Sequence, residues 1–312
     1  MDKLSLLHPD QFPTSLDFDH PETILPLFDV EEIADGIEKK VFPAEKLIRF
    51  DAIINDTKFA LTIDLSGAIG QTKPEQIVMA AKLFWYCYPQ MYARFATKTS
   101  PTDIILYIEN FGYEVAEAWD NKVHIHDGWL ACCPIDFDCL THEFAHIVQS
   151  DWIEEYMPFF EDDSYMVERF ADFCRYLYAF KDGKFNDLTW DLQTAEIENT
   201  YHDSVRFWIW LDYTYSTPEN DIYAKMNAQI LSQKYTTAEW AADGIAWQDV
   251  FTGTAAYGKN LHTLWDEYVA TEMAMLPSGV EQPGEVSPLL KSVSLRDAVN
   301  SRFAASRSYL KV

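Results

Sequence analysis

Two histidines four residues apart, with a glutamate beside the first, lie near the middle of the sequence. Residues 141–150 read THEFAHIVQS and contain His142, Glu143 and His146. On a helix, residues i and i+4 share one face, so both imidazoles can point at one ion. Two neutral imidazoles are good zinc ligands, and a neighbouring carboxylate can take a proton from water on that ion. The spacing predicts a hydrolytic zinc centre with Glu143 as general base; a helix with two ordinary histidines is the alternative.

A third ligand is expected from a second helix. Residues 165–177 (YMVERFADFCRYL) carry apolar side chains at helical spacing. Glu168 and Asp172 are four residues apart and therefore face the same way, and a buried carboxylate is costly unless it is paired or binds metal. We predict that Glu168 completes a His₂Glu set with one position left for water, and that Asp172 accepts the free ring N–H of a ligand histidine. The alternative is that both carboxylates pair with Arg169 and Arg175 on a solvated face.

The order of these motifs resembles a known group of enzymes. HExxH followed by ExxxD is similar to the gluzincins, the thermolysin-like metallopeptidases, and the longer pattern resembles the basic secretory protein family of zinc metallopeptidases. The matching segments are 123–126 (VHIH), 141–149, Val167-Glu168-x-x-Ala171-Asp172-x-x-Arg175, Tyr201-x-x-x-x-Arg206-Phe207 and Leu261-x-x-Leu264-Trp265-x-x-Tyr268. The resemblance implies a zincin fold in which His142, His146 and Glu168 bind Zn²⁺ and Glu143 is the base. The chain departs from that family in being acidic and in showing no secretory leader.

Hydrolysis through a tetrahedral intermediate also needs a hydrogen-bond donor that faces the developing oxyanion. The aromatic stretch 196–213 offers Tyr201 and His202. Tyr201 is the first candidate because its place in the chain is similar to one in the family pattern, and His202 is the second. An ordinary buried tyrosine is the alternative.

The net charge of −26 argues against a nucleic acid or an anionic membrane as partner. It is typical of a soluble acidic surface and also suits a cationic substrate. No apolar run approaches the length of a membrane span. The resemblance implies a peptide or protein as substrate, and the sequence leaves the oligomeric state open.

Cysteine usage favours a reducing compartment. The cysteines are Cys87, Cys132, Cys133, Cys139 and Cys174. Their number is odd and two are adjacent, which predicts buried thiols rather than a disulfide framework or a separate thiolate metal site. The first residues carry no apolar core of a signal peptide. We expect a cytoplasmic location, with export that needs no leader as the alternative.

Three regions are expected along the chain. Residues 1–44 are read as an irregular extension around one short helix near residues 30–39, residues 45–276 as the zincin-like domain, and residues 277–312 as a linker and a basic helical tail. The domain divides into an upper lobe, 45–150, and a helical lobe, 151–276. The predicted fold class is α+β: a small mixed β-sheet lobe and a mainly helical lobe, with the active-site helix between them.

The upper lobe has a predicted order of elements. A hairpin is expected from residues 46–55 and 58–65, then a helix that begins at Pro74 and kinks or stops at Pro89. Strands are expected at 103–109, 114–119 and 122–126, and one of them should be an edge that pairs with an extended peptide. The lobe also contains two histidines without an assigned role. His124 and His126 share a strand face and either line the cleft or are surface or core residues.

Two charged segments are open to more than one interpretation. The acidic segment 154–163 is expected to be a solvated loop, with a Ca²⁺ site or a selector of basic substrate residues as alternatives. The basic tail is expected to dock on the acidic body, either on the back of the helical lobe or over the cleft.

Together these features predict a zinc-dependent metallopeptidase that cuts peptide bonds inside a chain. Two alternatives stay open. One is a catalytically inactive module that binds zinc or peptide, against which the intact Glu143 argues. The other is a host-targeting protease effector, whose selectivity would come from a partner surface.

Overall fold

The computed structural model describes residues 12–31, 33–112, 115–132, 139–149, 165–179, 205–232, 234–241 and 243–270. The chain divides into two compact units. Of the described residues, 12–149 and 178–179 belong to the first unit, and 165–177 and 205–270 belong to the second. Within this described part, no helix is long and apolar enough to cross a membrane.

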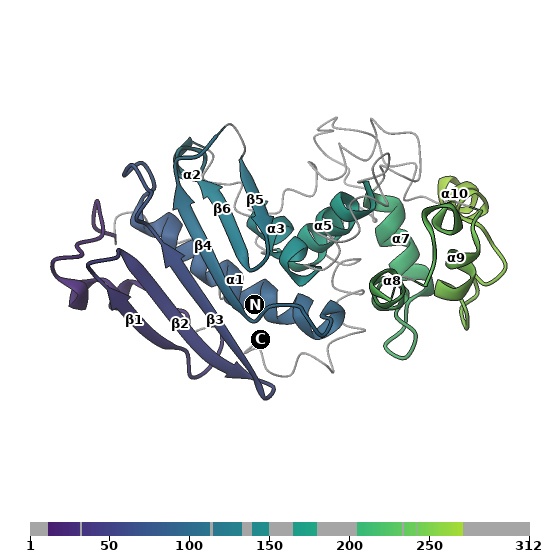
Figure 1. Cartoon of the computed structure of the whole chain (residues 1–312), viewed down its shortest axis with the longest axis horizontal. Coiled ribbons are helices and arrows are strands. Elements are labelled where there is room, and N and C mark those ends of the chain that lie inside the picture. The colour runs from purple at the N-terminus through teal and green to yellow at the C-terminus, as the bar shows by residue number, and fades with distance from the viewer. Residues whose placement is uncertain are drawn as a thin grey trace, which may run out of the picture. The chain divides into compact units, whose positions relative to one another are not determined.

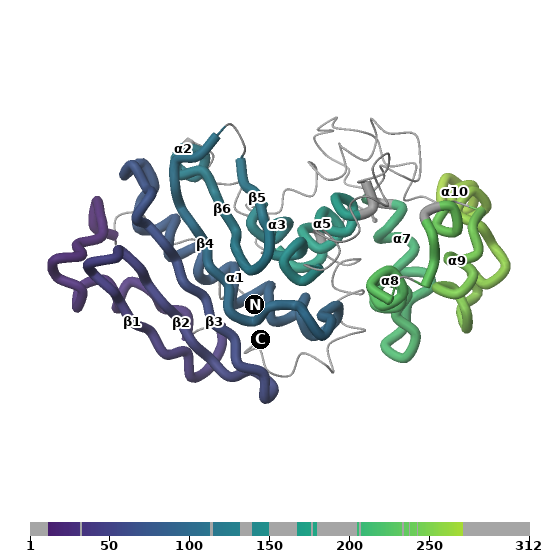
Figure 2. The backbone as a smooth tube through the Cα atoms, in the orientation of Figure 1, coloured from purple at the N-terminus to yellow at the C-terminus, as the bar shows by residue number. Residues whose placement is uncertain are grey.

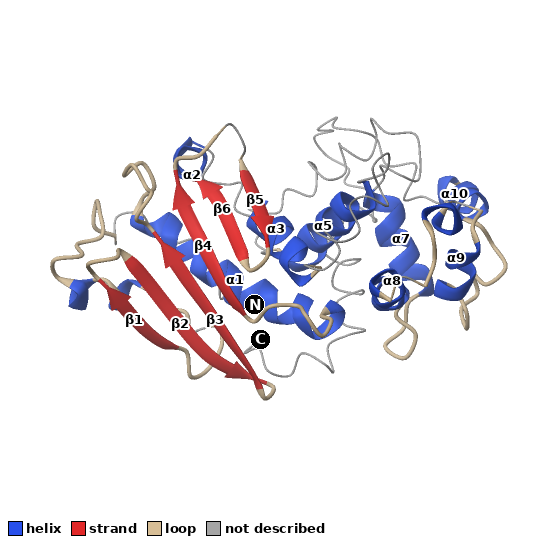
Figure 3. Ribbon diagram, viewed as in Figure 1, coloured by secondary structure: helices blue, strands red, loops and turns tan. Residues whose placement is uncertain are grey.

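The first unit is built on a six-stranded mixed sheet in the order β1-β2-β3-β4-β6-β5 (Figures 1 and 3). The strands are β1 (Glu38–Phe42), β2 (Leu47–Ile54), β3 (Thr57–Asp64), β4 (Asp103–Glu109), β5 (Ala116–Trp119) and β6 (Lys122–His126). Strand β4 is parallel to β3 and β6, whereas the other neighbouring pairs are antiparallel. The prediction of a mixed sheet combined with helices is confirmed, and among the strands that the structure describes, β1 and β5 are the edges of the sheet.

The predicted hairpin is present as β2 and β3, which reverse within two residues (Figure 2). Asn55 and Asp56 have φ angles of 47° and 61°. Positive φ at both central positions is what a type I′ turn requires, and Asn and Asp tolerate it better than other side chains. The turn pairs Ile54 with Thr57 and so sets the register of both strands.

Helices α1 (Pro74–Phe95) and α3 (Cys139–Val148) lie against one face of the sheet (Figure 1). The short helix α2 (Asp127–Cys132) directly follows β6. The Phe144 ring of α3 meets Phe84 and Tyr88 of α1, with centroids 5.3 and 6.0 Å away. All three rings are fully buried. This aromatic contact fixes α3 against α1.

The second unit is helical. Its helices are α5 (Tyr165–Tyr178), α7 (Val205–Tyr215), α8 (Ile222–Leu231), a 3₁₀ turn η5 (Thr237–Trp240), α9 (Ile245–Val250) and α10 (Leu261–Val269). Aromatic rings form its core: Phe173 stacks on Tyr223 at 4.4 Å, and Trp208 meets Trp247 at 5.8 Å. The boundary between the two units falls near the end of α5: Leu177 belongs to the second unit and Tyr178 to the first.

Of the two outcomes expected at Pro89, a kink or a stop, the stop does not occur, since α1 continues to Phe95. A proline inside a helix removes one backbone hydrogen bond, at a cost of about 3 kcal/mol. The residues around it, Trp85, Tyr88 and Met91, are fully buried. Burying such side chains contributes roughly 1.5–3 kcal/mol each, so packing outweighs the lost bond.

The prediction of a short helix near residues 30–39 is also wrong. The described residues of this segment form turns and then enter β1. Gly36 adopts φ +71°, which is incompatible with a continuing helix. Lys39 lies opposite Phe50 of β2 and donates to the carbonyl of Phe28 at 2.9 Å. Pairing with the edge of β2 therefore overrides the local helical pattern.

Three cysteines, Cys87, Cys139 and Cys174, are buried thiols. Desolvation raises the pKa of the Cys87 thiol well above its ordinary value. The acidic segment 154–163, the basic tail and Cys133 lie outside the described residues.

An arginine joins three strands on the sheet face opposite α1 and α3. Arg49 of β2 binds both carboxylate oxygens of Asp103 at 2.9 and 3.1 Å, Asp51 at 3.0 Å and Thr62 Oγ1 at 3.0 Å. Burial by itself raises the pKa of Asp51, but the hydrogen bonds and charge of Arg49, aided by Lys58, lower that pKa below its ordinary value.

We expect Arg49→Met to lower the free energy of unfolding by about 1–2 kcal/mol at pH 7, because it leaves Asp103 without its cation and Asp51 with only the more exposed Lys58. A lowered folded-state pKa stabilises the fold above the unfolded-state pKa, and that stabilisation is lost as pH falls through the folded-state value. The difference between variant and native chain should therefore shrink below pH of about 4. Urea denaturation at pH 7 and pH 3 measures the difference in the free energy of unfolding between Arg49→Met and the native chain. The control is Lys58→Met, which removes a more exposed cation from Asp51. An equal loss at both pH values would contradict this role.

Candidate metal centre

Helix α3 carries the two histidines on the face opposite its aromatic anchor. At 100° per residue, Phe144 lies about 200° from His142 and from His146. Because Phe144 is buried against α1, both histidines are turned away from that contact. His146 is only 7% exposed, whereas His142 is partly exposed. Local helix geometry and one buried ring thus set the direction of both imidazoles.

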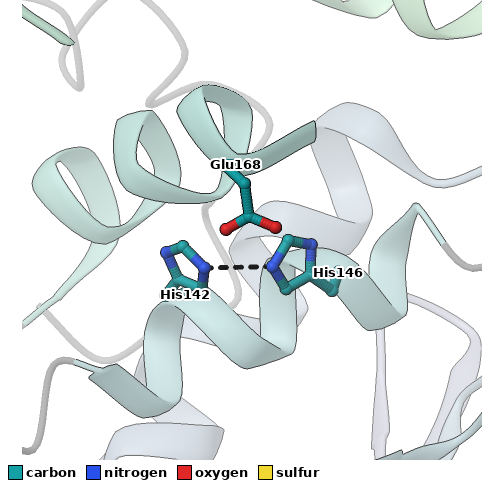
Figure 4. A group of neighbouring side chains, drawn as sticks. All are labelled: His142, His146 and Glu168. Carbon is teal, nitrogen blue, oxygen red and sulfur yellow. Dashed lines mark hydrogen bonds between the residues drawn. The ribbon is translucent and has the colours of Figure 1, made fainter. Parts of the chain in front are cut away.

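The two imidazoles converge with the carboxylate of Glu168 (Figure 4). His142 Nε2 lies 3.0 Å from His146 Nε2, and the two rings are inclined at 81°. One ligand atom from each of the three residues lies within 4.8 Å of the others. Glu168 comes from the first turn of α5, and Figure 4 shows its carboxylate directed at the two rings.

The donor set fits a transition-metal cation. Tetrahedral zinc with Zn–N distances of about 2.0–2.1 Å places two ligand nitrogens about 3.3 Å apart. The observed 3.0 Å between the imidazole nitrogens is close to this value, and the carboxylate oxygen, which lies within 4.8 Å of one atom of each histidine, needs to approach by at most about 1.5 Å. Two imidazoles and one carboxylate suit zinc and its neighbours better than Mg²⁺ or Ca²⁺, which prefer oxygen ligands only. Three protein ligands leave a coordination position open, as in catalytic sites.

Glu143 lies in the buried part of the same helix. Its side chain is 8% exposed, and it directly follows His142 in the chain. A carboxylate that directly follows a candidate ligand histidine is where a general base is expected. Its catalytic role stays a prediction.

Asp172 lies one turn after Glu168 on α5. Arg169 Nη1 donates to Asp172 Oδ2 at 2.9 Å, and the two side chains are 17% and 11% exposed. The alternative interpretation, in which the carboxylates of α5 pair with its arginines, is therefore met for Asp172 and Arg169. This ion pair lies on a buried face and not on a solvated one. The proposed contact of Asp172 with a ligand histidine stays a prediction.

The two strand histidines are not part of this cluster. His124 stacks between Tyr107 at 4.5 Å and Trp119 at 4.2 Å, and its Nδ1 is hydrogen-bonded to Glu109. His126 Nδ1 accepts the backbone N–H of Gly128 at 3.0 Å. Both imidazoles therefore have structural contacts in the sheet face.

Tyr201 and His202 lie outside the described residues, so their assignment as oxyanion donors stays a prediction. The sequence interpretation assigned no role to Glu117 and Trp119 of the edge strand β5, which share one face of that strand. Their i, i+2 spacing just before the Asp120-Asn121 turn was the available signal, because it places both on one strand face.

Comparisons of the chain with protein-family models, with curated proteins and with solved structures find no match. The similarity to gluzincins and to the basic secretory protein family therefore stays a prediction. The convergence of His142, His146 and Glu168 is the observation on which a function can be based.

We expect one zinc ion per chain and its loss in His146→Ala, because two remaining protein ligands hold zinc poorly. Elemental analysis after dialysis measures the stoichiometry. His262→Ala, which removes an exposed histidine of α10, is the control and should keep the metal. One tightly bound zinc per chain in His146→Ala would rule out this centre.

Glu168→Ala should weaken zinc binding more than Asp172→Ala. Loss of a direct ligand is expected to exceed the roughly 10- to 100-fold effect typical of residues that orient a ligand. Competition with a chromophoric chelator gives both affinities, and Asp266→Ala on α10 is the matched control. Unchanged affinity in Glu168→Ala would show that another residue supplies the third ligand.

Proposed function

We propose that the chain is a zinc-dependent metallopeptidase that hydrolyses peptide bonds inside polypeptide substrates. The single observation that carries this proposal is the approach of ligand atoms from His142, His146 and Glu168 to within 4.8 Å. The adjacent, buried Glu143 supports hydrolysis over a purely structural site, since a structural site needs no base. A gluzincin-like fold related to the basic secretory protein family is part of the same proposal.

The three ligands would hold Zn²⁺, which supplies a Lewis acid and lowers the pKa of a coordinated water to about 7. Glu143 takes the proton of the attacking water and later delivers it to the leaving amine. Asp172 would orient a ligand imidazole, and Tyr201 or His202 would donate a hydrogen bond to the oxyanion.

Strand β5 is suited to hold the substrate. It is an edge of the sheet, and α3 packs against it. The backbone N–H of His126 donates to the carbonyl of Val115. In an antiparallel pair, residues that form backbone hydrogen bonds with the partner strand alternate with residues that do not. The backbone groups of Glu117 and Trp119 therefore bond to β6, and the N–H and C=O groups of Ala116 and Ala118 point outward from the sheet. An extended peptide can pair with this edge by strand addition.

We expect Glu143→Gln to keep the metal and to lower peptide turnover by roughly 10²–10⁴-fold, because the amide cannot accept the proton. Hydrolysis of an internally quenched peptide library and the zinc content are measured on the same preparation. Glu45→Gln, at an exposed turn, is the control. Full activity of Glu143→Gln would exclude the proposed base, and loss of its metal would make Glu143 a ligand instead.

A further inference from the structure

Strand β5 presents two side chains to the open face of the sheet. Glu117 pairs with His124, and Trp119 pairs with Lys122. Because side chains alternate along a strand, Glu117 and Trp119 share one face, and Ala116 and Ala118 share the other. Within the described part of the chain, no strand lies beyond β5. A strand added at this edge would place every second side chain beside Glu117 and Trp119.

The Trp119 ring is held in position. One of its faces stacks on His124, with centroids 4.2 Å apart and planes 11° apart. His124 in turn stacks on Tyr107 at 4.5 Å and is hydrogen-bonded to Glu109. Among the described residues, Trp119 makes no ring contact other than that with His124. An indole fixed on one side can receive a cation on the other with little loss of side-chain entropy.

The Glu117 carboxylate is available for a charge partner. It is partly exposed, and it forms no hydrogen bond or ion pair with any residue that the structure describes. Lys122, which pairs with Trp119, lies on β6, the inner side of Trp119. The next residue after β5 is another acid, Asp120, and the whole chain carries a net charge of −26. The edge therefore offers a carboxylate and an aromatic face but no cation of its own strand.

Building on the proposed function, we propose that Glu117 and Trp119 make β5 selective for extended peptide segments with arginine or lysine on the face beside them. A guanidinium or ammonium group pairs with the carboxylate and lies over the indole. Facing side chains of neighbouring strands are about 4.5–5.5 Å apart at Cβ, so a long basic side chain reaches both groups. An acidic side chain at the same position faces a like charge.

Binding, measured apart from hydrolysis, tests this selectivity. Fluorescein-labelled decapeptides of the form (Thr-X)₅, with X as Arg, Gln or Glu, are titrated against the full chain carrying Glu143→Gln, and anisotropy gives Kd. Because X recurs at every second position, the outcome does not depend on register. We expect the Arg peptide to bind best and the Glu peptide worst, with Kd rising roughly 3- to 10-fold from Arg to Gln and again from Gln to Glu.

Variants of the edge strand separate a local contact from a general charge effect. Glu117→Lys should reverse the order of the Arg and Glu peptides, and Glu117→Gln should reduce the difference. Glu45→Lys makes the same change in net charge at the β1–β2 turn near the opposite edge and should leave the order unchanged. Trp119→Leu should weaken binding of the Arg peptide, and Trp119→Phe should restore most of it.

Equal effects of Glu117→Lys and Glu45→Lys would overturn the inference, because the preference would then come from the overall charge. Absence of peptide binding, or binding without a preference for Arg, would overturn it as well. Cleavage of peptides without the preference leaves the proposed function standing and removes this inference. If the Arg peptide binds best but the native chain cleaves no peptide, the inference about β5 stands and the proposed function is removed.

Discussion

The contact of Phe144 with α1 is the interaction on which the candidate centre depends. Its ring is buried against Phe84 and Tyr88, and this contact fixes the rotation of α3 about its own axis. Because Phe144 lies between the two histidines in the chain, burying it turns both imidazoles to the opposite side. A change in this aromatic packing would therefore alter the candidate metal centre without replacing His142, His146 or Glu168.

A cation would stabilise the converging side chains, because their carboxylates are partly removed from water. Glu143 is buried, and Glu168 approaches the two histidines from α5. Carboxylates removed from water are costly unless a cation or hydrogen bonds compensate for the lost hydration. A divalent ion held by His142, His146 and Glu168 would supply that positive charge. The same ion would favour the ionised form of Glu143, which is the form that accepts a proton.

The two faces of the sheet are stabilised by different kinds of contact. The face against α1 and α3 is apolar and gives the first unit its core. The opposite face is held by polar and aromatic contacts between strands: Arg49 joins β2, β3 and β4, and the column of Tyr107, His124 and Trp119 joins β4, β6 and β5. The ring column supports β5, the edge strand against which α3 packs, and keeps its Trp119 ring in place.

The sequence by itself determined the features that depend on local spacing: the shared helix face of His142 and His146, the β2–β3 hairpin and the strands around the Asp120-Asn121 turn. It also pointed to Glu168, from the cost of burying a carboxylate. Only the tertiary structure decided that ligand atoms from α3 and α5 meet within 4.8 Å. It also decided that α1 continues past Pro89 and that Lys39 joins a strand. These outcomes depend on packing and strand pairing between residues distant in the chain, which local periodicity does not encode.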